Sequence, residues 1–217
     1  MKINLPTKIT ISRIVLVFAL LIFLFVFVIL GKFNGYVSPR LGDTPIYVVN
    51  FVAFIVFVVA SSTDWLDGHL ARKNNQVTTL GKFLDPIADK MLVNSMLIFL
   101  IFPWEYYGAN GGNIYIPVYC VILMIIRDLV VDTLRFVAAS KNEVIAANIF
   151  GKLKTVFQMI AIPMVLLNGW PFSYFDASWP VYCRISMIFI YLATLMSVIS
   201  GVIYVIQNFH CLKEVKK

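Results

Sequence analysis

The chain has 217 residues, of which 60% are hydrophobic and 13% are charged, and its mean hydropathy is +0.87. A soluble domain carries about 25% charged residues, so this composition excludes that class and predicts an all-α integral membrane protein. The net charge of +7 does not indicate a nucleic-acid partner, because the basic residues are spread among segments between apolar runs, a pattern typical of attraction to anionic membrane lipid.

The N-terminal segment, residues 1–8, is short and basic. It could lie on the membrane surface, or it could be an ordinary positively charged flank of the first span. Six apolar runs follow, each long enough or nearly long enough to cross about 30 Å of hydrocarbon as a helix. No linker separates them, so residues 1–217 are expected to form one membrane-embedded catalytic domain. The predicted spans are residues 9–30, 46–65, 87–103, 115–137, 147–167 and 181–207.

The basic residues predict the orientation of these spans. Of the 18 lysines and arginines, Lys32, Arg40 and Arg184 fall on one side of the predicted membrane and the other 15 on the opposite side. Because cytoplasmic segments carry the excess of Lys and Arg, both termini are expected in the cytoplasm. No Arg-rich, acidic-poor transit segment precedes the first span, which favours a bacterial plasma membrane over an organelle.

An acidic stretch joins the second and third spans. Asp64 and Asp67 close one span, and Asp85 and Asp89 open the next, close to the cytoplasmic interface. Spacings of three and four residues put each pair on one helical face if the second span stays helical past Asp64. Four converging carboxylates would repel one another, and a divalent cation relieves that repulsion. Oxygen ligands suit Mg²⁺, or Mn²⁺ as a substitute, so we predict a metal-dependent catalytic site.

The residues between these aspartates favour phosphate binding. Gly68 has no side chain, so a phosphate or backbone could approach closely there. Arg72, one turn later, offers a planar fork for phosphate oxygens. Gly81 permits a turn or a close ligand contact before the third span. Pro86 suits the first turn of that span, which would leave Asp85 near its N-cap.

Three other interpretations compete with a catalytic site. Carboxylates in loops are commonly just solvated. Four carboxylates in this spacing between two spans make that interpretation less convincing. A divalent-cation transporter would use the same carboxylates, but it predicts polar residues near the middle of several spans and has no need of Gly68, Arg72 or Gly81. A non-catalytic membrane scaffold would leave the whole pattern without a role.

A second polar cluster lies in the fourth and fifth spans. Asp128 and Asp132 are one turn apart there, and they could form internal ion pairs that hold helices together. The surrounding cations outnumber these two carboxylates, and a surplus of positive charge beside a metal site suits a phosphate-bearing second substrate. The four cations in question are Arg127, Arg135, Lys152 and Lys154.

The acidic stretch resembles the complete signature of the CDP-alcohol phosphotransferase family, Asp-x2-Asp-Gly-x2-Ala-Arg-x8-Gly-x3-Asp-x3-Asp. That resemblance implies a six-helix membrane fold, a homodimer and a two-metal centre held by Asp64, Asp67 and Asp85. It implies that Asp89 is both a metal ligand and the general base. The pocket for the CDP moiety would be lined by Gly68, Ala71, Arg72, Thr78 and Gly81.

The other spans resemble one branch of that family, in which the acceptor is sn-glycerol 3-phosphate. The matching features are Arg127-Asp128, Leu134-Arg135, the segment from Gly151 to Thr155, and an N-terminal Thr10-x2-Arg13; the branch often has Glu where this chain has Asp128. The resemblance implies transfer of a phosphatidyl group from CDP-diacylglycerol to glycerol 3-phosphate. Phosphatidylglycerol, serine and inositol phosphate stay open as alternative acceptors.

Overall fold

The computed structural model describes residues 5–34, 38–73, 79–102, 114–141, 143, 145–146, 148–176 and 178–209. All the longer regular elements in these ranges are α-helices, and one isolated β-bridge joins Arg40 to Tyr47. The helices are α1 (Leu5–Asn34), α2 (Val48–Lys73), α3 (Thr79–Phe99), α4 (Val118–Ser140), α5 (Ile149–Leu166), α6 (Ser173–Asp176) and α7 (Ile185–Gln207), with a short 3₁₀ turn at Val181–Cys183.

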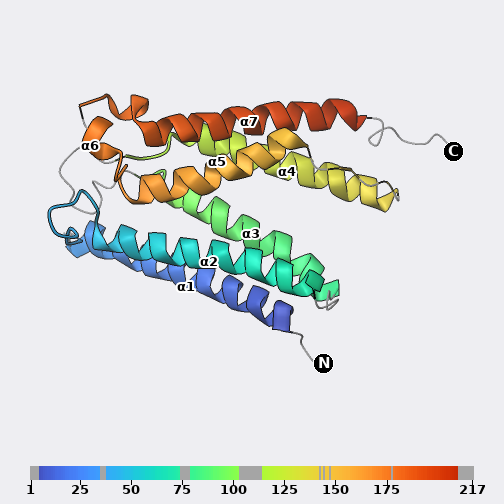
Figure 1. The fold of residues 1–217 in the computed structure, drawn as a ribbon, viewed down its shortest axis with the longest axis horizontal. Helices are drawn as coiled ribbons and strands as arrows, with labels where there is room; N and C mark the ends of the chain where they lie inside the picture. Colours follow the sequence, from blue (N-terminus) through green and yellow to red (C-terminus); the bar gives the residue numbers. More distant parts are fainter. Residues whose placement is uncertain are drawn as a thin grey trace.

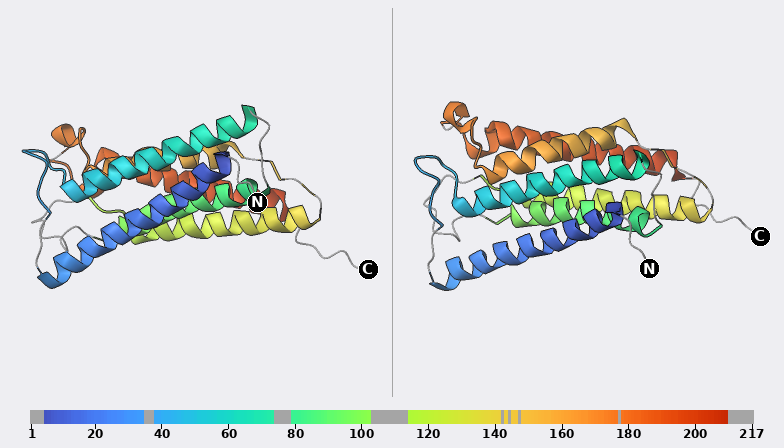
Figure 2. Two further views of the ribbon diagram at one scale, coloured as in Figure 1. Left: turned by 90° about the horizontal axis from the view of Figure 1, so that it is seen from below. Right: turned by 60° about the horizontal axis from the view of Figure 1, so that its bottom comes forward.

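The six long helices lie side by side in a bundle (Figure 1). One half contains α1, α2 and α3, and the other contains α4, α5 and α7, as the two further views also show (Figure 2). Contacts of α3 with α4 and α5, and of α2 with α5, join the halves. The start of α1 and the end of α7 lie at the same end of the bundle, together with the end of α2 and the start of α3.

Each predicted span corresponds to one long helix. Three helical segments are long and apolar enough to cross a membrane by length and composition, within the part of the chain that is described: Thr7–Gly31, Ile149–Leu166 and Ile185–Gln207. The apolar part of α2, Val48–Thr63, is shorter. Four charged residues interrupt the apolar sequence of α4, and their contacts are described below with the site.

The core and the outer surface are both apolar. Leu24, Phe57 and Leu97 are among the largest fully buried side chains, whereas Phe18 and Phe25 of α1 are half exposed or more. The exposed apolar positions of α1 recur every three or four residues, so they form one stripe along the helix. Such a stripe would be unfavourable in water and suits contact with hydrocarbon.

The structure corrects the predicted start of the third span. Helix α3 begins at Thr79, so Pro86 lies inside the helix and Asp85 is not at its N-cap. Gly81 is likewise helical and makes no turn there. A proline inside a helix removes one backbone hydrogen bond and clashes with the carbonyl four residues earlier, which costs about 3 kcal/mol. Helix α2 does continue past Asp64, as the three-residue spacing required, and ends at Lys73.

Asp176 caps the last helix from outside it. Its side chain is fully buried, and its Oδ2 accepts a hydrogen bond of 2.9 Å from the backbone N–H of Ile185, the first residue of α7. A carboxylate at this position also interacts favourably with the positive end of the helix dipole. We expect Asp176→Ala to lower the free energy of unfolding by about 1–2 kcal/mol. Thermal unfolding of the purified protein measures this, and Asp176→Asn, which keeps an acceptor oxygen, should lose less.

Candidate active site

The acidic stretch is carried by two helices that contact each other. Asp64 and Asp67 lie in the last turns of α2, and Asp85 and Asp89 lie in the first half of α3. Gly68, Ala71 and Arg72 are also in α2, and Gly81 is in α3. Of these residues, Asp89 alone has a described side chain, and Thr78 lies wholly outside the described residues.

Asp89 is linked to the first helix. Nη1 of Arg13 lies 3.6 Å from Oδ1 of Asp89, with the arginine side chain fully buried and the aspartate side chain 46% exposed. Thr7 and Thr10 are buried on the same face of α1, six and three residues before Arg13 respectively. A buried guanidinium so close to a carboxylate restricts where that carboxylate can lie.

The residue after Asp89 connects α3 to the second polar cluster. Lys90 forms an ion pair with Asp132 of α4. It also lies within electrostatic range of Arg127, Asp128, Arg135 and Lys154. The part of α3 that carries Asp89 and Lys90 therefore lies next to the second polar cluster, although the two are far apart in sequence.

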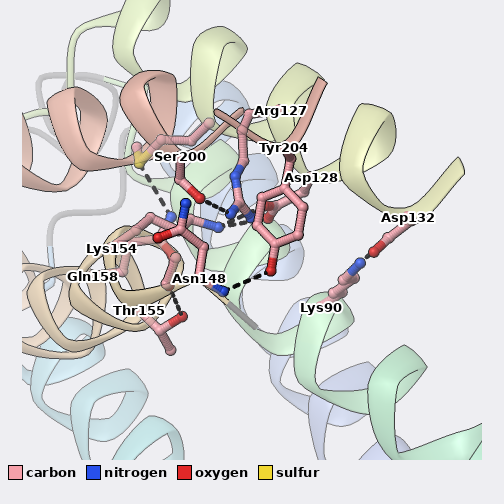
Figure 3. A network of polar contacts seen from close by, with 12 residues as sticks. Lys90, Arg127, Asp128, Asp132, Asn148, Lys154, Thr155, Gln158, Ser200 and Tyr204 are labelled. Atoms are coloured by element: carbon pink, nitrogen blue, oxygen red, sulfur yellow. Dashed lines mark hydrogen bonds and ion pairs between the residues drawn. The ribbon is translucent and has the colours of Figure 1, made fainter. Parts of the chain in front are cut away.

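Asp128 is the centre of that cluster. Its two oxygens each accept a 2.7 Å hydrogen bond from Nζ of Lys154 on α5, and Oδ1 also accepts a 3.1 Å bond from Nη1 of Arg127. Asp128 and Lys154 are 7% and 5% exposed, so this ion pair is nearly dehydrated. Figure 3 shows the pair beside Arg127, Ser200 and Tyr204, with the Lys90–Asp132 pair to one side. The expectation that Asp128 and Asp132 form internal ion pairs is confirmed for both.

The four predicted acceptor-site cations do not all converge. Arg127 and Lys154 share Asp128, and Arg135 donates a 2.8 Å hydrogen bond to Oη of Tyr204. Lys152 is exposed on α5, and a residue two positions from Lys154 does not share its helical face. The described contacts therefore group Arg127, Arg135 and Lys154 more closely than Lys152.

A model of the CDP-alcohol phosphatidyltransferase family matches residues 3–203 of this chain. The chain belongs to this family. It is 40% identical over 210 residues to a Bacillus subtilis protein named CDP-diacylglycerol–glycerol-3-phosphate 3-phosphatidyltransferase, with 97% of each chain covered. A Mycoplasma pneumoniae protein of the same name is 36% identical, covering 97% of this chain and 89% of its own. One from Escherichia coli K12 is 32% identical over 88% and 87% of the two chains.

Membership in the CDP-alcohol phosphatidyltransferase family agrees with the kind of metal-ligand atoms that the acidic stretch offers. Its four aspartates supply oxygen ligands alone, the type that Mg²⁺ and Mn²⁺ prefer, and they lie on α2 and α3, two helices that contact each other. Among the described side chains no three His, Cys, Asp or Glu residues come together, and three of these four aspartates lie outside that set. The residue types therefore fit a divalent metal.

Several residues of this site were not assigned to it from the sequence. Arg13 was part of the N-terminal pattern, but nothing in the sequence paired it with Asp89. Ser200 and Tyr204 lie in the apolar α7, where a single serine or tyrosine is ordinary. A usable signal was present for Arg13, because an arginine buried within an apolar span needs an anionic partner.

Proposed function

We propose that this protein transfers the phosphatidyl group of CDP-diacylglycerol to sn-glycerol 3-phosphate, giving phosphatidylglycerophosphate and CMP. The observation that carries the proposal is the similarity, along nearly the whole chain, to proteins named for that reaction. The cationic cluster of α4 and α5 next to Asp89 supports it, since the acceptor carries a phosphate.

Asp89 is the proposed general base. Its carboxylate accepts the proton of the acceptor's hydroxyl group, and the hydroxyl oxygen attacks the phosphorus of the phosphatidyl group. A new phosphorus–oxygen bond forms, the bond from that phosphorus to the CMP phosphate oxygen breaks, and CMP leaves with the bonding electrons. Arg13 holds the carboxylate in place from α1.

Asp64, Asp67, Asp85 and Asp89 are the proposed ligands of two divalent ions, Mg²⁺ or Mn²⁺. When bound, such ions neutralise the charge that develops on the departing CMP phosphate. Next to these ions, the CDP moiety is held by the backbone and side chains of Gly68, Ala71, Arg72, Thr78 and Gly81.

The acceptor's phosphate is held by cations of the second cluster. Arg127 is the main ligand, because Lys154 already gives two hydrogen bonds to Asp128 and has less capacity for a second anion. Lys154 fixes Asp128, which in turn orients Arg127. Arg135 and the exposed Lys152 add positive charge that attracts a dianionic substrate.

The proposed setting is a bacterial plasma membrane crossed six times, by α1, α2, α3, α4, α5 and α7, with both termini and the active site facing the cytoplasm. The similarity to bacterial relatives, the excess of basic residues at one side and the even number of long helices support it. The acyl chains of the donor stay in the bilayer beside the apolar outer surface, and two copies of the chain form a homodimer.

The decisive test supplies the purified protein with CDP-diacylglycerol and one acceptor at a time. Glycerol 3-phosphate should support CMP release, and serine, inositol phosphate and phosphatidylglycerol should not. A chelator should remove at least about 99% of the rate, since two metals are proposed to act on the reacting phosphate, and added Mg²⁺ should restore it. Activity with serine but none with glycerol 3-phosphate would refute the proposal, and full activity in excess chelator would refute its metal dependence.

A further inference from the structure

One face of α7 is polar although the helix is apolar overall. Ser197, Ser200, Gly201 and Tyr204 are buried, and their spacing of three, four and seven residues places them on one side of the helix. That side packs against α4 and α5, which carry the acceptor-site cations. The proposed reaction assigns no task to these four residues.

Arg127 fits closely against this face. Its Nη2 donates a hydrogen bond to Oγ of Ser200, and its guanidinium carbon lies 5.6 Å from the centre of the Tyr204 ring. A Cβ added at Gly201 would lie 2.9 Å from Cγ of Arg127, and one at Gly151 of α5 would lie 2.9 Å from Nη2. Both glycines therefore leave the space that the arginine side chain occupies.

Tyr204 is fixed by hydrogen bonds on all sides of its hydroxyl group. It donates to the carbonyl of Ala146 at 3.1 Å and accepts from the backbone N–H of Asn148 at 2.9 Å and from Nη2 of Arg135 at 2.8 Å. A hydroxyl group has one donor and two acceptor sites, so all of its hydrogen-bonding sites are used. The guanidinium of Arg135 also lies 5.4 Å from the ring centre, and both arginines thus contact one rigid aromatic side chain.

Arg127 retains a donor that its protein contacts do not use. Nη1 binds Asp128 and Nη2 binds Ser200, while Nε is buried and has no hydrogen-bond acceptor in the described ranges. A buried donor without an acceptor costs free energy, and an anionic ligand would remove that cost. The guanidinium is held in one orientation with capacity left for phosphate oxygens.

We propose that Ser200, Gly201 and Tyr204 are positioning residues for acceptor specificity: they hold Arg127 and Arg135 in the orientation that binds a phosphomonoester dianion. This inference rests on the proposed function, since it names how the acceptor's phosphate is recognised. The three residues do not touch the reacting atoms. They act through the two arginines.

The test measures initial rates of the purified full-length protein with each substrate varied in turn. Ser200→Ala and Tyr204→Phe should raise KM for glycerol 3-phosphate by about tenfold or more, the effect of misplacing one charged hydrogen-bond donor. KM for CDP-diacylglycerol and kcat should change little in both variants, and Tm should change little in Ser200→Ala. Inorganic phosphate should inhibit the wild type competitively against the acceptor and should be a weaker inhibitor of both variants.

The matched controls lie on the same helix. Ser197→Ala makes the same change at a buried serine whose Oγ has no partner among the described atoms, and Tyr191→Phe removes a hydroxyl nearer the start of α7. Both should keep the wild-type KM for the acceptor. Ser200→Ala removes a single oxygen, so it still provides a test if Tyr204→Phe does not fold.

If the wild type uses glycerol 3-phosphate, either of two results would overturn the inference. One is an unchanged acceptor KM in both variants. The other is an equal rise of KM for both substrates with a fall in Tm, which indicates a structural role only. A wild type that is inactive with glycerol 3-phosphate would instead refute the proposed function, and this inference with it.

Discussion

Replacing Asp89 with asparagine is expected to reduce phosphatidyl transfer by at least about 100-fold, because the amide cannot accept the proton of the attacking hydroxyl group. The amide is also a weaker metal ligand than a carboxylate, so the loss should be closer to about 10,000-fold if both proposed roles are real. The measurement is the rate of CMP release from CDP-diacylglycerol with glycerol 3-phosphate at saturation.

The control for Asp89→Asn is Asp43→Asn, the same change at an exposed aspartate in the loop between α1 and α2. It should leave the rate unchanged. Asp89→Asn should also stay folded, because the side chain is 46% exposed and asparagine keeps a side-chain oxygen that can face Arg13. A variant within tenfold of the wild-type rate would show that Asp89 is not the base.

Replacing Asp128 with alanine is expected to destabilise the protein by about 3–5 kcal/mol, because it leaves the Lys154 ammonium buried without its carboxylate. The two side chains are nearly fully buried, and both oxygens of Asp128 contact Nζ of Lys154. Arg127 would lose its 3.1 Å bond to the same carboxylate. Chemical or thermal unfolding of the purified protein measures the loss.

A double variant separates stability from binding at this ion pair. Asp128→Leu with Lys154→Met removes both charges, and it should recover most of the stability lost by Asp128→Ala, since an apolar replacement of a buried pair is commonly near neutral. Transfer to glycerol 3-phosphate should still be reduced, because Arg127 is no longer oriented. Recovery of both stability and acceptor KM would show that the pair only holds α4 and α5 together.

The positions of the long helices could be predicted because apolar runs of about 20 residues have few alternatives to a spanning helix. The start of α3 could not, because a proline suits a first turn and can also lie inside a helix. The sequence likewise predicts one polar cluster with Arg127, Asp128 and Lys154, but not that both oxygens of Asp128 would contact Lys154.

Contacts between helices that are far apart in the sequence leave no local sequence pattern from which they could be predicted. The pairs Arg13–Asp89 and Lys90–Asp132 each join residues from different helices, and hydrophobic periodicity does not say which helices are neighbours. Helical periodicity could have separated Lys152 from Lys154, since residues two apart do not share a face. The close fit of Arg127 against Gly151 and Gly201 depends on ångström-scale packing, which composition and spacing do not encode.

The consecutive residues Asp89 and Lys90 give α3 a mechanical role in the proposed reaction. Asp89 ties this helix to α1 through Arg13, and Lys90 ties it to α4 through Asp132. Adjacent residues of α3 thus carry the proposed base and the contact with α4, the helix of Arg127 and Arg135, so a rotation or slide of α3 should disturb both ion pairs together. A perturbation that shifts α3 is therefore expected to affect the proposed proton transfer and the proposed acceptor binding together.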